Sequence, residues 1–441
     1  MTRSAHRPDA ADTPSAAGLS RRRVLGSAAL ATAAVTGAAL VGEATPASAA
    51  TTSPSVSGPP SLNRSFVQVR RGRFEVDGKA FRFGGTNTYY LHQQSHYMID
   101  SALDDAAAMG LAVVRCWAFA DGTGPTIPLQ PRPFVYDEAA FDSLDYAVWK
   151  AGQLGLRLVL TLVNNWPDYG GMQQYVQWFL GLPDDSYGAA VNHDRFYTDP
   201  VIRRCYREWT KHVVTRRNRY TGQRYNADPT IMTFELANEP RNRSDKTGAP
   251  VLAWVKEMST WLRQWAPAQL IAVGDEGFFG QATNADYPYS NYEGMHWEAL
   301  VKVPDIDYGT VHVYPQGWGE ISSSKPGTTP VAWGTQWIRD HLTAGHRLNT
   351  PVVVEEYGLA IDATKDVPDV ATRDTGYAAW TAEVETSGWG DQFWLLTSRV
   401  DDGSFYPDYD GYRIMWRADD TNPSRTTATL LSQHAARMRQ P

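Results

Sequence analysis

Cysteine is scarce in this chain of 441 residues, which contains only Cys116 and Cys205. Two thiols cannot form the disulfide framework that holds small secreted domains together. Cys116 ends an apolar run with the character of a buried strand, so we expect a core thiol. A Cys116–Cys205 disulfide is the alternative.

Long basic runs are also missing, and the net charge is -7. Nucleic acids and anionic membrane surfaces attract positive charge, so both features argue against them as partners and favour a neutral substrate. With 42% hydrophobic residues, the chain can bury the core of one barrel or of two smaller domains. Its 16 Trp and 22 Tyr suit a protein that stacks on sugar faces, although most would pack inside the fold.

The N-terminal apolar stretch is too weakly hydrophobic to indicate a membrane anchor. Ser20-Arg21-Arg22-Arg23 precedes an Ala/Gly-rich run over residues 24–41, and Ala47-Ser48-Ala49 has the small residues that signal peptidases require. This pattern resembles a twin-arginine export signal. We therefore interpret residues 1–49 as a signal peptide and expect a secreted, extracellular protein with no stable membrane association after cleavage.

The remaining chain is predicted to be one domain. Residues 50–63 are rich in Thr, Ser, Pro and Gly and are interpreted as a linker. No internal repeat and no second linker follows, so we expect residues 64–441 to fold as a single unit and the protein to be a monomer.

Short apolar runs alternate with amphipathic stretches along this domain, which predicts an α/β fold of the (β/α)8 barrel type. The eight predicted strands are Phe81–Gly85, Ala112–Cys116, Arg157–Val163, Thr230–Leu236, Leu270–Val273, Tyr308–Val313, Pro351–Glu356 and Gln392–Leu396. The five predicted helices are Met98–Met109, Phe141–Leu154, Val201–Thr215, Val251–Trp265 and Thr375–Ser387. Asp199-Pro200 has the pattern of a helix start.

Polar and aromatic residues concentrate at the ends of the predicted strands, where barrel enzymes carry out chemistry. Two apolar runs end on a carboxylate, one in Asn238-Glu239-Pro240 and the other in Glu355-Glu356-Tyr357-Gly358. A pair of acids at this rim suggests a glycosidase. Side chains alternate along a strand, so we expect one member of the Glu355-Glu356 doublet to face the barrel axis and the other the helices.

Seven motifs follow one another at these strand ends. They are Gly85-Thr86-Asn87, Val114-Arg115-Cys116-Trp117, Asn164-Asn165-Trp166 with Asp168 to Gly171, Glu235 to Arg241, Gly274-Asp275-Glu276-Gly277, His312-Val313-Tyr314-Pro315 and Glu356-Tyr357-Gly358. Together they resemble glycoside hydrolase family 5, and within it the fungal and plant-type endo-β-1,4-mannanases. The resemblance covers nearly all of the chain after the linker.

The resemblance implies a retaining, two-glutamate reaction on mannan, galactomannan and glucomannan. Glu239 would be the general acid/base and Glu356, placed immediately before Tyr357, the nucleophile. Their carboxyl groups would then lie about 5 to 5.5 Å apart. For this chemistry the pKa of Glu239 must be raised while Glu356 stays ionised.

The resemblance also implies supporting roles for other residues. Arg115 would keep Glu356 charged, His312 and Tyr314 would orient the two acids, and Asn238 would contact the sugar 2-hydroxyl. Trp394 would form the platform under the sugar at the cleavage point. The residues expected to line neighbouring subsites, or else only to pack, are Trp166, Arg241, Glu276 and Trp318.

We expect neither a cofactor nor a metal ion, because the Asp104-Asp105, Asp184-Asp185 and Asp401-Asp402 doublets lack a recognised ligand spacing. The expected partner is β-mannan polysaccharide. Within the same fold, an exo-β-mannosidase, a cellulase and a mannan transglycosylase stay open. A catalytically silent carbohydrate-binding protein is the alternative from another class.

Overall fold

The structure is a computed structural model that describes residues 61–124, 127–284, 286–320, 328–361, 367–416 and 422–440. The predicted export signal and the predicted linker up to residue 60 lie outside these residues. Asn63, at the end of the predicted linker, donates from Nδ2 to the carbonyl oxygen of Leu156 at 2.8 Å. None of the helices in the described ranges has the length and apolar character of a membrane-spanning segment.

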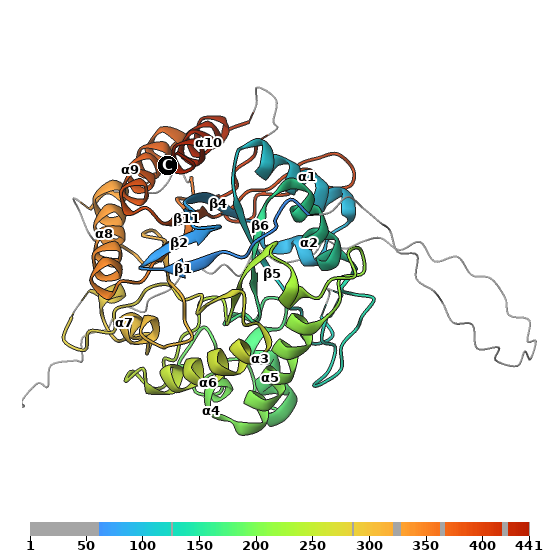
Figure 1. Ribbon diagram of the computed structural model, residues 1–441. Helices are drawn as coiled ribbons and strands as arrows, with labels where there is room; N and C mark the ends of the chain where they lie inside the picture. The colour runs from blue at the N-terminus through green and yellow to red at the C-terminus, as the bar shows by residue number, and fades with distance from the viewer. Residues whose placement is uncertain are drawn as a thin grey trace, which may run out of the picture.

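Eight parallel strands form the centre of the molecule (Figure 1). In sheet order they are β8 (Leu270–Ala272), β7 (Ile231–Glu235), β6 (Arg157–Thr161), β5 (Val113–Trp117), β4 (Phe83–Asn87), β11 (Gly390–Phe393), β10 (Val352–Tyr357) and β9 (Gly309–Val313). Backbone hydrogen bonds close the sheet, because Asp307 N–H donates to Ile271 O at 2.9 Å and His312 N–H donates to Glu276 O at 3.1 Å. The predicted (β/α)8 barrel is therefore confirmed.

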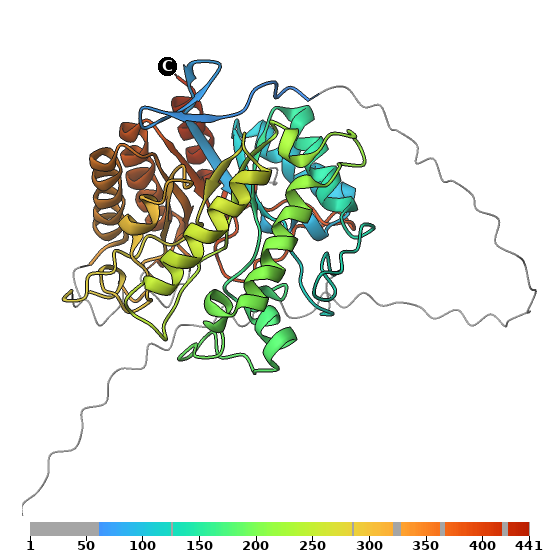
Figure 2. The same cartoon turned by 60° about the horizontal axis from the view of Figure 1, so that its bottom comes forward.

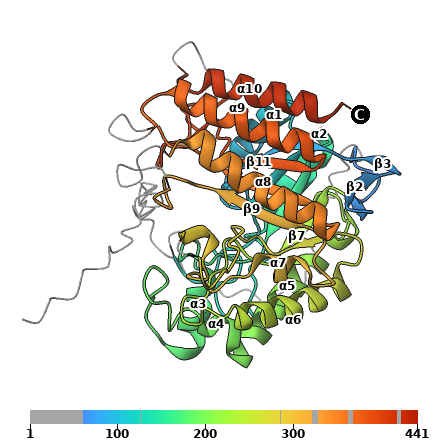
Figure 3. The same ribbon diagram turned by 90° about the vertical axis from the view of Figure 1, so that its left-hand side faces the viewer.

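Helices surround this barrel (Figures 1 and 3). The five predicted helices are α1 (His96–Ala108), α2 (Asp142–Leu154), α5 (Pro200–Thr215), α6 (Ala249–Trp265) and α9 (Val370–Ser387). The helices that the sequence analysis missed are α3 (Gly171–Leu180), α4 (Arg195–Thr198), α7 (Trp297–Val301), α8 (Pro330–Leu348), α10 (Arg425–Met438) and the 3-10 turns Tyr89–Gln93, Tyr225–Ala227 and Tyr287–Tyr289.

The predicted start of α5 is confirmed by its capping geometry. Asp199 Oδ1 accepts hydrogen bonds from the backbone N–H groups of Val201 at 2.9 Å and Ile202 at 3.1 Å. Pro200 occupies the first helical position, where its missing N–H costs nothing. An Asp-Pro pair of this kind satisfies the free donors of the first turn.

A small antiparallel sheet covers the end of the barrel at which the strands begin (Figures 2 and 3). Its strands are β1 (Gln68–Arg70), β2 (Arg73–Val76) and β3 (Lys79–Ala80). Phe74 is buried, and its ring lies edge-on to Tyr308 with ring centroids 5.4 Å apart. Trp389 Nε1 donates to the Gly72 carbonyl oxygen at 2.8 Å, which ties this sheet to β11. This sheet does not cover the opposite end of the barrel, where the strands finish and where barrel enzymes carry their functional groups.

Both cysteines are unpaired and buried. Burial raises the pKa of Cys116 and of Cys205 to about 12, so neither thiol is ionised at neutral pH. The predicted core role of Cys116 is confirmed.

Gly274, which follows β8, sits where any side chain would collide with the end of β7. Its φ is +83°, and a Cβ atom would lie 2.0 Å from the carbonyl oxygen of Ala237 and 2.2 Å from Oε1 of Glu235. The Gly274 carbonyl oxygen accepts the backbone N–H of Glu239 at 2.8 Å. This close approach of two chain segments therefore helps to place Glu239.

We expect Gly274→Ala to lower the free energy of unfolding by about 3 kcal/mol or more, because backbone strain and a clash with fixed backbone atoms add together. Gly78→Ala is the matched control. Its φ is +74°, but nothing lies within 4 Å of the added Cβ, so it should cost about 1 kcal/mol. Urea unfolding measures both, and equal losses would contradict this account.

Candidate functional site

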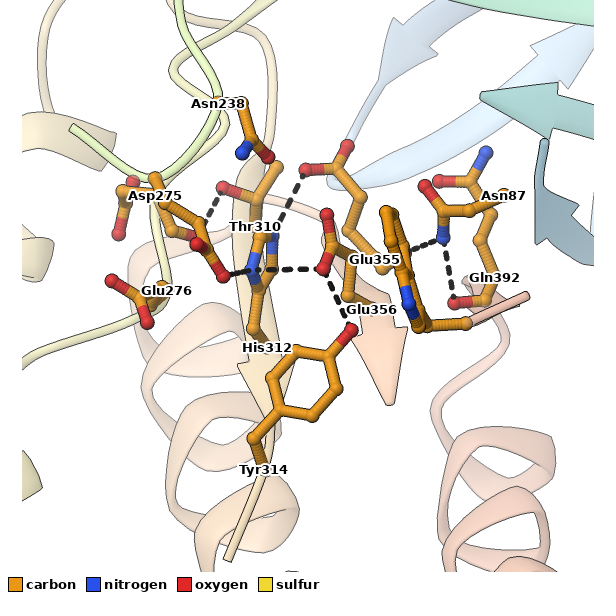
Figure 4. Close-up of polar contacts among 12 residues, drawn as sticks. Asn87, Asn238, Asp275, Glu276, Thr310, His312, Tyr314, Glu355, Glu356 and Gln392 are labelled. Atoms are coloured by element: carbon orange, nitrogen blue, oxygen red, sulfur yellow. Dashed lines mark hydrogen bonds and ion pairs between the residues drawn. The ribbon is translucent and has the colours of Figure 1, made fainter. Parts of the chain in front are cut away.

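Polar side chains gather at the end of the barrel where the strands finish, away from β1–β3. β4 ends on Asn87 and β5 carries Arg115, while His312 lies on β9 and the Glu355-Glu356 doublet lies on β10. All of these side chains are buried. Figure 4 shows the imidazole of His312 directed toward Glu355 and Glu356 of the adjacent strand.

Arg115 is the centre of the hydrogen-bond network. Its Nε and Nη2 donate to the two carboxylate oxygens of Glu235 at 2.8 and 2.5 Å, and its Nη1 donates to Glu356 Oε1 at 2.5 Å. The two remaining N–H groups reach Asn87 Oδ1 at 3.1 Å and Asn238 Oδ1 at 2.9 Å. All five guanidinium N–H groups are therefore used. Burial opposes the charge, but the surrounding carboxylates hold the pKa of Arg115 well above its usual value.

Glu356 accepts hydrogen bonds at both carboxylate oxygens. Arg115 binds Oε1, and the hydroxyl of Tyr314 donates to Oε2 at 2.7 Å. Together these two bonds fix the position of the carboxylate. Arg115 and Tyr314 therefore both contact Glu356, and their supporting roles stay a prediction.

Glu239 lies after β7 and has the left-handed φ of +49°. Its Oε1 lies 3.0 Å from Nδ1 of His312, and its Oε2 accepts the indole N–H of Trp166 at 2.6 Å. The neighbouring Asn238 donates from Nδ2 to Asn164 Oδ1 at 2.9 Å. The structure therefore brings Glu239, Trp166, Asn238 and His312 together.

Glu239 and Glu356 face each other across His312. A carboxylate oxygen of each lies within 4.8 Å of the other and of His312 Nδ1. Burial disfavours a charged imidazole, but Glu356, Glu239 and Glu355 outweigh it and raise the pKa of His312 to about 10. Three such ligands could hold a divalent metal ion, yet a ring nitrogen that keeps its proton opposes metal binding.

Glu355 departs from the predicted alternation, because both members of the doublet point inward. The pairing of β10 with β9 shifts between Val354 and Glu356, which makes Glu355 the bulged residue. A bulge re-aims a side chain that regular pleating would turn away. Glu355 Oε2 consequently lies 3.6 Å from both Arg115 Nε and His312 Nε2.

Arg241 and Glu276 form a second buried network beside Glu239. The guanidinium donates to both Glu276 oxygens at 2.6 Å and to Glu293 Oε1 at 3.0 Å. Burial raises the pKa of Glu276 to about 7, against the opposing effect of Arg241. Arg241 also lies over the Trp166 ring, 5.0 Å from its centroid, which joins this network to Glu239.

The predicted aromatic platform is part of a larger aromatic cluster. Trp394, which follows β11, is 8% exposed and stacks on Tyr89 with ring centroids 5.5 Å apart and an interplanar angle of 8°. Trp117 packs against both rings. Trp318 lies elsewhere, against Tyr314 and α8, so it is an outer neighbour of the site.

Some contributors to the site were not predicted as site residues. Glu235 anchors Arg115, Glu293 pairs with Arg241, and Tyr89 stacks on Trp394. The signal for Glu235 was available, because an acid inside an apolar strand needs a buried partner. Glu293 lies in a loop that carries no such signal.

Comparisons with known proteins agree with this geometry. A family model described as "GH family 5 beta-mannosidase-like" matches residues 64–394. The mannan endo-1,4-beta-mannosidase 1 of Solanum lycopersicum is 35% identical over 309 residues, which are 67% of this chain and 74% of the relative.

Two solved structures are similar as well. The endo-beta-1,4-mannanase from Thermotoga petrophila is 38% identical, with a TM-score of 0.70 over 82% of this chain and 77% of its own. The endo-1,4-beta-mannanase from Rhizomucor miehei is 33% identical, with a TM-score of 0.72 over 85% of this chain and 99% of its own.

We expect Arg115→Lys to lower the free energy of unfolding by about 3 kcal/mol, because an ammonium cannot replace five directed N–H groups and leaves buried carboxylates unpaired. Arg339→Lys is the control. Arg339 also makes two bonds to one carboxylate, that of Glu383, but its side chain is 57% exposed, so the loss should be much smaller than for Arg115→Lys. Calorimetry gives the free energy of unfolding of both variants. Similar losses in the two would contradict the argument that burial makes Arg115 irreplaceable.

Proposed function

The chain belongs to glycoside hydrolase family 5, and from this premise we propose that it is a retaining endo-β-1,4-mannanase. It would cleave internal β-1,4-mannosidic bonds of mannan, galactomannan and glucomannan. The observation that carries the mechanism is the approach of Glu239 and Glu356 to within 4.8 Å, measured between one carboxylate oxygen of each. Retaining pairs lie about 5 to 5.5 Å apart, whereas inverting pairs leave room for a water between them at about 6.5 to 9.5 Å.

Glu356 is the proposed nucleophile. Arg115 and Tyr314 favour its ionised form and fix its orientation, as attack on an anomeric carbon requires. The attack forms a covalent glycosyl ester on one Glu356 oxygen while the glycosidic bond breaks.

Glu239 is the proposed acid/base. It would first give its proton to the leaving glycosidic oxygen and then take a proton from the water that hydrolyses the ester. Between these steps Glu239 is a carboxylate. The N–H of His312 Nδ1 and that of Trp166 are placed to stabilise it in this form.

Mannan is the proposed substrate because the three relatives reported above, which are 33 to 38% identical to this chain over the matched regions, are named as endo-acting mannanases. Trp394, backed by Tyr89, is the proposed platform for the sugar ring. Arg241 and Glu276 are proposed to line neighbouring subsites. Export directed by the twin-arginine-like signal peptide over residues 1–49 is part of the proposal and rests on the sequence alone.

Product sizes test the proposed substrate and mode of attack. The protein from Ala50 onward is incubated separately with linear β-1,4-mannan, carboxymethylcellulose and mannobiose, and products are followed over time. We expect mannooligosaccharides of mixed size to appear early from mannan alone. Mannose as the sole product would indicate an exo-β-mannosidase, and release of sugars from carboxymethylcellulose would indicate a cellulase. Products longer than an added oligosaccharide would indicate a transglycosylase. No product from any of the three substrates would indicate a binding protein.

Azide rescue tests the two glutamate roles. We expect Glu356→Gln to lower kcat at least about 10⁴-fold while oligosaccharide binding persists. Glu239→Ala should regain activity with azide on an aryl mannoside, because an activated leaving group needs no acid and azide needs no base. The mannosyl azide should be the β anomer.

Glu356→Ala is the matched comparison. Azide can then replace only the nucleophile, so any rescued product should be the α anomer. An exchange of the two anomers between the variants would reverse the assignments. Glu383→Gln, which alters an acid outside the site, should keep normal activity.

A further inference from the structure

Glu355 is a buried carboxylate for which the proposed mechanism has no use. As the bulged residue of β10 it points toward the barrel axis beside Glu356, and its side chain is completely buried (Figure 4). Neither of its carboxylate oxygens accepts a hydrogen bond from any residue that the structure describes. Burying an uncompensated carboxylate is costly, so the group that compensates its charge determines what Glu355 does.

The donors around Glu355 can be counted. Arg115 Nε is 3.6 Å away, but all five N–H groups of this guanidinium are used elsewhere. The hydroxyl of Tyr308 donates to Thr233 Oγ1 at 3.2 Å. His312 Nε2 lies 3.6 Å from Glu355 Oε2 and also lacks a hydrogen-bond partner among the described residues. Glu235 also faces Glu355, and burial together with the Glu355 carboxylate raises the pKa of Glu235 to about 8 against the effect of Arg115. Both oxygens of Glu235 accept N–H groups of Arg115, so Glu235 is committed as an acceptor. His312 Nε2 is thus the donor beside Glu355 that is not bonded to another described residue.

Resting on the proposed function, we propose that Glu355 is a positioning residue that holds the second proton of His312. The carboxylate faces Nε2–H, so the imidazole remains a cation and keeps Nδ1–H directed at Glu239, 3.0 Å away. A neutral imidazole has one N–H and one acceptor nitrogen, and Nδ1 would then be free to become the acceptor. Glu355 would prevent this change while Glu239 is a carboxylate.

Other titratable groups also face His312 from the neighbouring strand ends. They are Glu239, Asp275, Glu276, Tyr314 and Glu356. Burial raises the pKa of Asp275 and of Glu276 to about 7, so neither is a constant anion near neutral pH. Glu356 becomes a neutral ester in the proposed intermediate, and Glu239 exchanges a proton twice. Glu355 is the neighbouring carboxylate on β10 that the proposed reaction leaves unchanged.

Titration of His312 tests this role independently of activity. Protein labelled with ¹⁵N-histidine is titrated from pH 6 to 10.5, and the His312 signals are assigned by their loss in His312→Gln. The Glu355 carboxylate favours the charged imidazole, so we expect wild-type His312 to keep both ring protons at pH 8. Glu355→Gln should lower the titration midpoint of His312 by at least about one pH unit, which is a tenfold lower affinity of the imidazole for its proton.

Glu293→Gln is the matched control, because it removes an equally buried carboxylate that pairs with Arg241 and Arg243 rather than with His312. It should move the His312 midpoint less than half as far. A wild-type imidazole that is neutral at pH 8, or a midpoint that Glu355→Gln leaves in place, would overturn the proposal. The wild-type titration decides even if the Glu355 variant does not fold.

Kinetics then separate positioning from a merely structural role. In Glu355→Gln, we expect kcat on mannan to be about tenfold lower than in the wild type at pH values above the new His312 midpoint, and to recover below that midpoint. A tenfold loss is the size of effect seen when a group that orients a functional histidine is removed. KM should change less than kcat. An equal loss at every pH would indicate damage to the fold and would overturn the proposal. Absence of wild-type activity on mannan would instead refute the proposed function and leave the titration valid.

Discussion

One buried guanidinium holds the site together. Arg115 rises from β5 and bonds to Asn87 on β4, to Glu235 and Asn238 at the end of β7, and to Glu356 on β10. Its bonds therefore tie together strands on both sides of the barrel. A buried ion cluster of this kind adds little net stability relative to an apolar core, but it is intolerant of a missing partner. The cluster favours one arrangement of these strand ends, because only in that arrangement does every N–H group of Arg115 have an acceptor.

Backbone irregularities then aim the acids that this cluster surrounds. A regular strand would turn one of two consecutive glutamates toward the helices, and the bulge at Glu355 keeps both inside. Glu239 has a left-handed φ, which costs free energy in a residue with a side chain. The close approach of Gly274 to the end of β7 helps to hold that conformation. Strain and register shifts thus occur where the proposed chemistry needs unusual directions.

The barrel could be predicted because most of its strands are short apolar runs, and every predicted strand overlaps an observed one. β4 and β11 are less apolar, with the sequences FGGTN and GDQF. The last prediction, Gln392–Leu396, was displaced from β11 because Leu395 and Leu396 are equally apolar and buried beyond the strand end. α8 was missed because its glycines disfavour a helix in isolation. Gly334 is needed there for packing, since a Cβ would lie 2.1 Å from the Trp380 indole nitrogen.

In the candidate site, too, only the features that follow from local sequence could be predicted. Residues in motifs at strand ends could be placed, and Arg115, His312 and Tyr314 contact the two acids as predicted. The direction of Glu355 could not be predicted, because a bulge depends on the pairing with β9. The contact of Arg241 with Glu293 joins residues 52 positions apart, with no local pattern to indicate it.

The two acids have partners of different kinds, and the proposed chemistry explains why. Glu356 must be an anion whenever it attacks, and its partner Arg115 does not titrate in the pH range of proteins. Glu239 must lose and regain a proton in each cycle, and it faces His312, whose charge depends on the carboxylates around it. An arginine with no carboxylate of its own beside Glu239 would favour the ionised form of Glu239 more strongly than a cation that is itself paired. In the proposed pair, the Glu355 carboxylate offsets the charge of the His312 cation. The imidazole then gives a fixed N–H to the ionised Glu239 while opposing the protonated form less than an unpaired cation would, and the leaving group requires that protonated form.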